Sequence, residues 1–240
     1  MISGNVLTMR TVLLTAIVMI SGLAASATPI QIFSRDALNA NDFVDWGQLP
    51  PPITILGEDV WVSSHNALMP VHASSSHELY SDQQGNPWAG NFSPGDALIG
   101  TGQFFPAAPI EITFDKPVRG LATQVGYNII SEDSFPFTAY LKLFDPNGAL
   151  LGSFTADGNM NNHADNSAVV LGAIDTEASI ARVELFASAE CAPGAFQNSF
   201  TINRLDLLID VPEPTTLIPV MLAMTLFITY RRLVVKARRA

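Results

Sequence analysis

The chain reads Ile110-Glu111-Ile112-Thr113-Phe114-Asp115 near its middle, and this alternation of apolar and polar side chains decides the fold. A period of two is typical of a β-strand that buries one face. The same period continues in the next run, from Leu121 to Tyr127. Because no apolar stripe with a 3.6-residue period accompanies these runs, we expect an all-β domain.

A β-hairpin is predicted immediately downstream. The apolar run 137–144 ends at Asp145-Pro146-Asn147-Gly148, and the run 149–155 follows it. Aspartate at the first position, proline at the second and glycine at the fourth all suit a tight turn. The two runs are therefore expected to pair as antiparallel strands.

Further strands are predicted at 168–173, 180–187 and 200–209. In the last of these, the apolar residues occupy even positions up to Ile202 and odd positions from Leu205 onward. A β-bulge near Asn203-Arg204 would keep both sets facing the core. Strands at this spacing, separated by glycine, proline, asparagine and aspartate, predict an antiparallel β-sandwich of jelly-roll type.

The first part of the body carries weaker signals. Pro50-Pro51-Pro52 marks a break, Val60 and Val62 indicate a short strand, and residues 72–102 are polar and expected to be rich in loops. Because no separate core is visible before residue 110, we assign this stretch to the same domain.

The N-terminus has the layout of a secretory signal peptide. Arg10 supplies a positive charge, residues 11–23 are almost wholly apolar, and Ala25-Ser26-Ala27 offers small residues for cleavage. We expect residues 1–27 to be removed, so that the mature chain starts at Thr28. An uncleaved anchor is the alternative, although its apolar core is short for a membrane span.

The C-terminus is predicted to form a transmembrane helix. Residues 215–230 carry no charge, and a helix over them would be about 24 Å long at about 1.5 Å per residue. Snorkelling basic side chains can extend such a span and stay on the cytoplasmic side. The basic tail consists of Arg231, Arg232, Lys236, Arg238 and Arg239. The body would then face outward, into the periplasm.

The C-terminus has three features in this order: the motif Pro212-Glu213-Pro214, a short apolar span and an arginine-rich end. Together they resemble the PEP-CTERM sorting signal. The resemblance implies that an exosortase, a membrane cysteine protease-transpeptidase, recognises residues 212–240 and removes them near the motif. It also implies a Gram-negative host that makes exopolysaccharide, with the body at residues 28–211 reaching the cell surface or extracellular matrix. A plain single-span anchor is the alternative. Residues 88–99 also resemble a pattern found in PEP-CTERM proteins of unassigned function.

The charge of the body narrows the class of partner. Of the 12 basic residues only six lie in 28–211, whereas 21 of the 22 acidic residues lie there, which gives a net charge of −15. A phosphate backbone must be met with lysine and arginine, so this charge argues against nucleic acid or anionic lipid as a partner. Divalent cations and neutral glycans are compatible with this charge.

A candidate calcium loop lies between two predicted strands. Its oxygen ligands would be Asp157, Asn159, Asn161 and Asp165, at the alternating positions that calcium loops use. The stretch departs from an EF-hand, because Asn162 and Ala168 stand where glycine and glutamate are required. The alternative is a polar hairpin loop, since asparagine and aspartate tolerate turn geometry.

Other candidate sites are weak. Imidazole and carboxylate ligands for zinc are offered by His65, His72, His77, Glu78 and Asp82. Their spacing is not that of a zinc module, and the serine run 74–76 indicates solvated loop histidines instead. The single Cys191 has no nearby histidine, and no Gly-x-Ser-x-Gly elbow is present.

Four aromatic residues could stack on sugar rings if they share one face, or could belong to the core: Trp46, Trp61, Trp88 and Tyr80. The C-terminal sorting tail, together with the lack of a catalytic motif in the sequence, predicts a non-enzymatic surface or matrix protein of the exopolysaccharide layer. Two alternatives stay open. One is a glycan-binding module, and the other is a carbohydrate-active hydrolase with a carboxylate pair in a concave, aromatic-lined surface.

Overall fold

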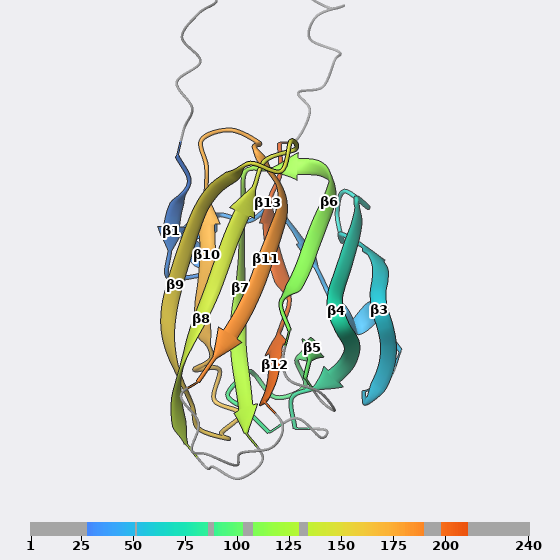
Figure 1. Ribbon diagram of the computed structural model, residues 1–240, viewed down its shortest axis with the longest axis vertical. Coiled ribbons are helices and arrows are strands. Elements are labelled where there is room, and N and C mark those ends of the chain that lie inside the picture. Colours follow the sequence, from blue (N-terminus) through green and yellow to red (C-terminus); the bar gives the residue numbers. More distant parts are fainter. Residues whose placement is uncertain are drawn as a thin grey trace, which may run out of the picture.

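A computed structural model describes residues 28–50, 52–85, 89–102, 108–129, 134–189 and 198–210. This part of the chain is built of β-strands (Figure 1), with two short 3-10 helices, η1 (Asp36–Leu38) and η2 (Trp46–Gln48). The strands are β1 (Ile30–Ile32), β2 (Asp42–Val44), β3 (Thr54–Ser63), β4 (Pro70–Gln83), β5 (Ala97–Thr101), β6 (Ile110–Val118), β7 (Gly120–Ile129), β8 (Phe135–Phe144), β9 (Leu150–Met160), β10 (Val169–Ile174), β11 (Ile180–Ser188), β12 (Asn198–Ile202) and β13 (Leu205–Leu208).

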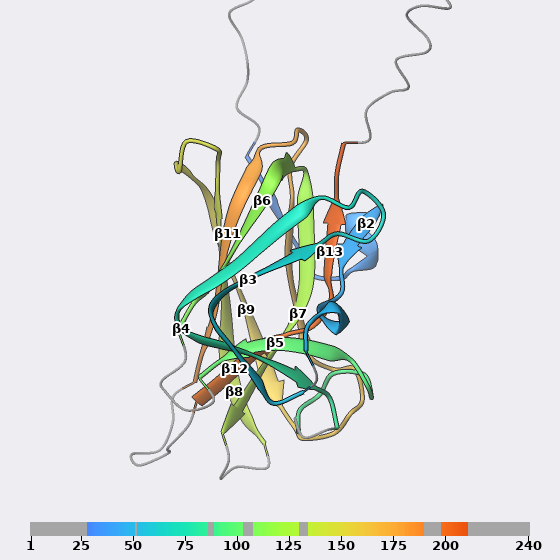
Figure 2. The ribbon, with the colours of Figure 1, turned by 90° about the vertical axis from the view of Figure 1, so that its right-hand side faces the viewer.

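All strand pairs are antiparallel, and the strands form two packed layers (Figures 1 and 2). The front sheet has the order β3-β4-β6-β11-β8-β9. The back sheet has the order β1-β10-β7-β12-β5-β4, and β13 and β2 extend it beside β7. The predicted antiparallel β-sandwich is confirmed, and the order of non-consecutive strands is consistent with a jelly-roll-like arrangement.

Strand β4 belongs to both sheets. Its first half pairs with β6 over Val71–Ser74, and its second half pairs with β5 over Leu79–Gln83. The neighbouring strand β3 follows this bend with register shifts around Gly57, whose φ of 88° suits glycine. The two layers are therefore joined by continuous backbone at one side.

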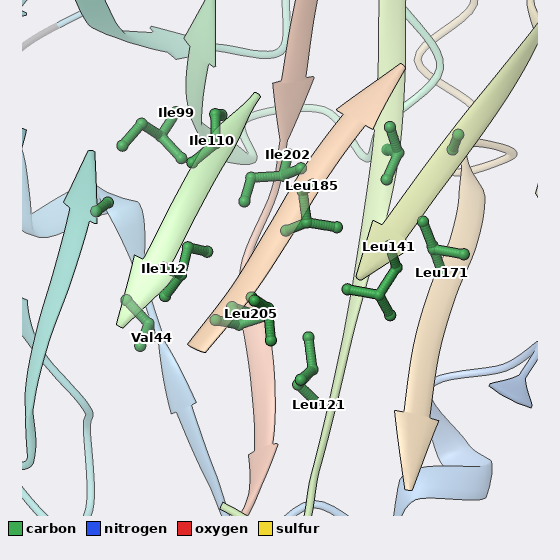
Figure 3. Packing of buried hydrophobic residues seen from close by; sticks show 14 of the residues in the cluster. Val44, Ile99, Ile110, Ile112, Leu121, Leu141, Leu171, Leu185, Ile202 and Leu205 are labelled. Carbon is green, nitrogen blue, oxygen red and sulfur yellow. The ribbon is translucent and has the colours of Figure 1, made fainter. Parts of the chain in front are cut away.

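The core lies between the two layers (Figure 3). Leu141 and Leu185 of the front sheet and Leu121 of the back sheet are all fully buried. Tyr127 of the back sheet stacks on Phe137 of the front sheet, with their ring centroids 6.0 Å apart. The alternating apolar residues of the sequence thus meet across the layers, as the period of two requires.

The predicted hairpin is confirmed. Strands β8 and β9 pair from Phe135 to Phe144, and Asp145 closes the turn between them. The backbone amide of Asp145 donates to the carbonyl of Ala149, and its side chain accepts from the amide of Asn147. Gly148 has a φ of 81°, which explains the need for glycine at this position.

The predicted bulge is also confirmed. Ile202 lies opposite Val125 of β7, and Asp206 lies opposite Ala122. Four steps along β12 and β13 therefore match three steps along β7, so that one residue is extra. Because of this insertion, both Ile202 and Leu205 are fully buried.

The prediction that residues 72–102 are rich in loops was wrong. Strand β4 occupies Pro70–Gln83 and β5 occupies Ala97–Thr101, so a loop is left only between them. Val71 and Ala73 point into the core, while His72 lies on the outer face of the sheet. Buried polar residues further along β4 hid this alternation in the sequence, because they break the apolar pattern.

Two small apolar clusters cover parts of the outer face of the back sheet. One contains Phe92 and Tyr80, and the other contains Ile32 and Leu38. A Cβ atom on Gly126 would lie 2.5 Å from the Phe92 ring, so only glycine admits this ring onto β7. The uncovered strip between the two clusters forms the floor of a groove.

The predicted terminal segments, residues 1–27 and 212–240, lie outside the described residues, as do Cys191 and Trp88. Within the described ranges, no helix has the length and apolar character that crossing a membrane would require.

Candidate functional site

A polar groove with a volume of about 1120 Å³ runs over the outer face of the back sheet. Residues 33–43 form one wall, and the segments 93–96 and 166–168 form the other. The floor is supplied by Gln124 of β7 and by the junction of β12 and β13. Small-molecule sites usually occupy about 300–1,000 Å³, so the groove can receive a ligand of several ring units.

Asn203, the residue at the bulge, is the centre of the groove floor. Its Nδ2 donates to Gln124 Oε1 at 2.7 Å and to Asp96 Oδ2 at 3.0 Å. Its Oδ1 accepts from the backbone N–H of Gln124 at 3.0 Å. Its carbonyl oxygen accepts from Trp46 Nε1 at 2.8 Å and from the Thr123 hydroxyl at 3.0 Å. The floor is therefore a rigid hydrogen-bonded layer.

An arginine from the start of the domain ties this layer to the last strand. Arg35 Nε donates to Asp206 Oδ2, while its terminal amino groups donate to Asn203 Oδ1 and to the carbonyl oxygen of Arg204. Arg204 Nε donates to the other oxygen of Asp206 at 2.9 Å. Since the Asp206 side chain is only 6% exposed, its charge depends on these two arginines.

Asp42 fixes the loop at one end of the groove. Its oxygens accept from the backbone amides of Phe43, Asn66 and Ala67 at 2.8, 2.7 and 3.1 Å. Burial alone would raise the pKa of Asp42, but hydrogen bonds from the Ser64 side chain and these three amides outweigh it and lower the pKa.

The Asp42→Asn variant is expected to be less stable than the wild type by about 2 kcal/mol at pH 7. A pKa lowered on folding contributes stability that is complete above the unfolded value and is lost as pH falls through the folded value. The difference between the two proteins should therefore shrink as the pH falls below 3.8, the ordinary value for aspartate. Denaturant unfolding between pH 7 and pH 2 measures it, and a difference that stays constant contradicts the assignment.

Aromatic rings and one cation line the rim of the groove. Phe43 stacks on His65 at 4.6 Å between centroids, and the Arg204 guanidinium lies 4.9 Å from the Phe43 centroid. Phe43 is thus a support that holds Arg204 over the groove. Phe33 is 72% exposed, so its ring is open to a ligand. About half of the Arg204 side chain is also exposed.

Four carboxylates line the groove, those of Asp36, Asp42, Asp96 and Asp206. A glycosidase needs a carboxylic acid and a second carboxylate across the scissile bond. Asp206 accepts from two arginines, Asp42 accepts from three backbone amides, and Asp96 accepts from Asn203. These three carboxylates are used as acceptors within the fold.

The aromatic residues singled out in the sequence do not share one face. Trp46 is buried under the groove floor, and Tyr80 is buried in the cluster with Phe92. Trp61 is 66% exposed and lies on the front sheet, away from the groove. Of the described aromatics among these candidates, only Trp61 can stack on a ligand.

The four candidate calcium ligands are divided between a strand and a loop. Asp157 and Asn159 lie on β9, where they bond to Thr138 and Ser134. Asn161 and Asp165 lie in the following loop and bond to each other, Nδ2 to Oδ2, at 3.0 Å. Hydrogen bonds from Ser167 and Asn161 lower the pKa of Asp165, against a smaller opposing effect of burial. The loop has the internal contacts expected of a polar turn.

The candidate zinc ligands are also separated. His65 stacks on Phe43, whereas His72 stacks on Trp61 and His77 lies further along β4. Across the ranges that the structure describes, no three histidine, cysteine, aspartate or glutamate side chains gather to hold a metal ion.

Sequence reasoning missed the residues that build the groove. Arg35 and Asp206 are 171 residues apart, and Gln124 and Asn203 are 79 residues apart. One signal was present: Asp206 stands between Leu205 and Leu207, which are both fully buried. A carboxylate between two buried leucines requires a partner.

Comparisons with known proteins give only distant likenesses. No family profile and no curated protein matches this chain. A DUF4465-family protein from Bacteroides caccae aligns with a TM-score of 0.37 at 11% identity, over 74% of this chain and 99% of that one. The CBM22-1 xylan-binding domain of Paenibacillus barcinonensis Xyn10C gives 0.32 at 11%, over 68% and 100%. The domain CsCBM6-3 from Clostridium stercorarium, solved with cellobiose, gives 0.20 at 9%, over 75% and 94%. These likenesses are too distant to assign a ligand to the groove.

Proposed function

We propose that this protein is a non-catalytic carbohydrate-binding protein and that the groove holds a short segment of a neutral glycan. The observation that carries the proposal is the groove floor, where amide and guanidinium groups are fixed in one hydrogen-bonded layer beside an exposed aromatic ring. A sugar presents hydroxyl groups at its edge and carbon-bound hydrogens on its face. Fixed polar groups and an aromatic ring match these two features.

The charge around the groove favours a neutral ligand. Arg35 and Arg204 are both paired with Asp206, and Asp36, Asp42 and Asp96 add further negative charge. A polyanion would meet this acidic lining and the acidic body, so it would be repelled. The exposed part of Arg204 can still donate hydrogen bonds to hydroxyl oxygens.

Export and sorting remain part of the proposal. The signal peptide, the motif Pro212-Glu213-Pro214 and the basic tail motivate them, and an exosortase is the expected processing partner. A glycan-binding body would then act in the exopolysaccharide layer at the cell surface or outside it. Intact-mass measurement of the protein from its native host tests this, because a processed product would begin at Thr28 and end near Pro212.

Phe33→Ala is expected to weaken the binding of neutral oligosaccharide fragments of the host exopolysaccharide by about tenfold, which is about 1.4 kcal/mol. Isothermal titration calorimetry measures the affinity. Leu68→Ala is the matched control, because Leu68 is equally exposed, at 70%, but does not line the groove. Equal affinities of the two variants would exclude the groove as the site. Release of reducing ends from the same fragments by the wild type would contradict the non-catalytic assignment.

A further inference from the structure

Side chains form rows across the outer face of the front sheet, on the side of the sandwich opposite to the groove. The strand registers place one residue from each of six strands in a single row: Trp61, His72, Thr113, Arg182, Phe144 and Leu150. A second row, two residues along each strand, contains the charged residues Asp59, Glu111, Glu184 and Lys142. The inward neighbours of these residues form the core, so both rows face outward.

The aromatic members of the first row are held in place by neighbouring side chains. The Trp61 ring stacks on His72, with centroids 4.4 Å apart and an interplanar angle of 21°. The Arg182 guanidinium lies 3.8 Å above the Phe144 ring. Trp61 nevertheless keeps 66% of its surface exposed. A large exposed ring that is already fixed loses little entropy when a ligand stacks on it.

The charged row supplies fixed hydrogen-bonding groups beside these rings. Arg182 bonds to Glu111 at 2.8 Å, and Lys142 bonds to Glu184 at 2.9 Å. Glu111 and Lys142 are nearly half exposed, so they can also bond to a ligand. A protein partner would have to bury these charges, which the centres of protein interfaces avoid. Hydroxyl groups can bond to them while water still reaches the face.

We propose that this face binds an extended neutral polysaccharide laid across the strands, and that the protein thereby holds a second glycan chain. Trp61 and Phe144 are four strand spacings apart, which is about 19 Å at about 4.8 Å per spacing. The occupant is therefore a linear polymer rather than a single sugar. Together with the proposed groove on the other sheet, the face makes the protein a cross-linker of polysaccharide. The surface itself does not depend on the groove.

The test compares the full-length wild type, Trp61→Ala and Trp61→Phe in affinity electrophoresis through hydroxyethylcellulose, xylan, galactomannan and dextran. We expect the wild type to be retarded by at least one of these polymers, and Trp61→Ala to weaken that retardation at least about tenfold. Trp61→Phe should restore part of it, because phenylalanine keeps a ring. Unchanged thermal unfolding of Trp61→Ala separates this loss from misfolding, and Leu68→Ala is the control at an exposed site outside the row.

Each outcome decides the proposal. Equal retardation of wild type and Trp61→Ala, or no retardation of the wild type by any polymer, would overturn it. A wild-type dimer in sedimentation that Trp61→Ala converts to a monomer would also overturn it, because the occupant would then be a second copy.

Cross-linking, measured as the viscosity of a solution of the retarding polymer, should be lost in Trp61→Ala and in Phe33→Ala. If cross-linking is lost in Trp61→Ala but kept in Phe33→Ala, the result supports glycan binding at this face and excludes the groove as the second site.

Discussion

Replacing Asp206 with alanine is expected to lower the free energy of unfolding by about 3 kcal/mol. The change leaves Arg35 without its carboxylate partner. The Arg35 side chain is only 20% exposed, so water cannot fully replace that partner. It also removes the acceptor for Arg204 Nε. Removing one partner of a buried ion pair costs more than the pair contributes, because the remaining charge stays desolvated.

Urea unfolding at pH 7 measures this effect, and Asp210→Ala is its control. Asp210 pairs with Arg119 at 3.8 Å, but 61% of its side chain is exposed, so its loss should change stability by less than about 1 kcal/mol. If the two variants are equally stable, the network around Asp206 does not hold the groove together. Asp206→Asn keeps the shape and should fall between the wild type and Asp206→Ala.

Leu141→Ala is expected to cost about 3 kcal/mol. Leu141 is fully buried in the middle of β8, where it faces the back sheet (Figure 3). Truncation removes its transfer free energy and leaves a cavity that the two hydrogen-bonded sheets cannot close.

The Leu150→Ala variant tests whether burial is the cause. Leu150 lies at the start of β9 and is 57% exposed, so the same truncation should cost less than about 1 kcal/mol. Thermal unfolding followed by circular dichroism compares both variants with the wild type. A similar loss in the two variants would mean that Leu141 is not a core residue.

Much of the fold could be predicted from short patterns. The alternation over residues 110–115 and the turn at Asp145 gave the correct strands, because both depend on neighbouring residues alone. The change of parity between Ile202 and Leu205 was enough to place a bulge. Local patterning of this kind is decided by which side chains must face the core.

The groove could not be predicted in this way. Its floor joins Arg35, Gln124 and Asn203, which come from three distant parts of the chain. Which polar residues meet depends on the order of the strands, and that order follows from the topology of the whole sandwich. Strand β4 was missed for a related reason. Several of its polar residues, among them Ser75, Ser81 and Asp82, are buried, so the apolar period is incomplete.

The position of β13 also bears on how the domain withstands a pulling force. This strand, the last that the structure describes, lies between β2 and β7 and is hydrogen-bonded to both. Bonds between antiparallel strands run perpendicular to the strand axis. Tension applied along β13 from the C-terminal side therefore loads both ladders in shear, so the bonds share the force and do not open one at a time. A chain held at that end can thus bear load without first losing its last strand.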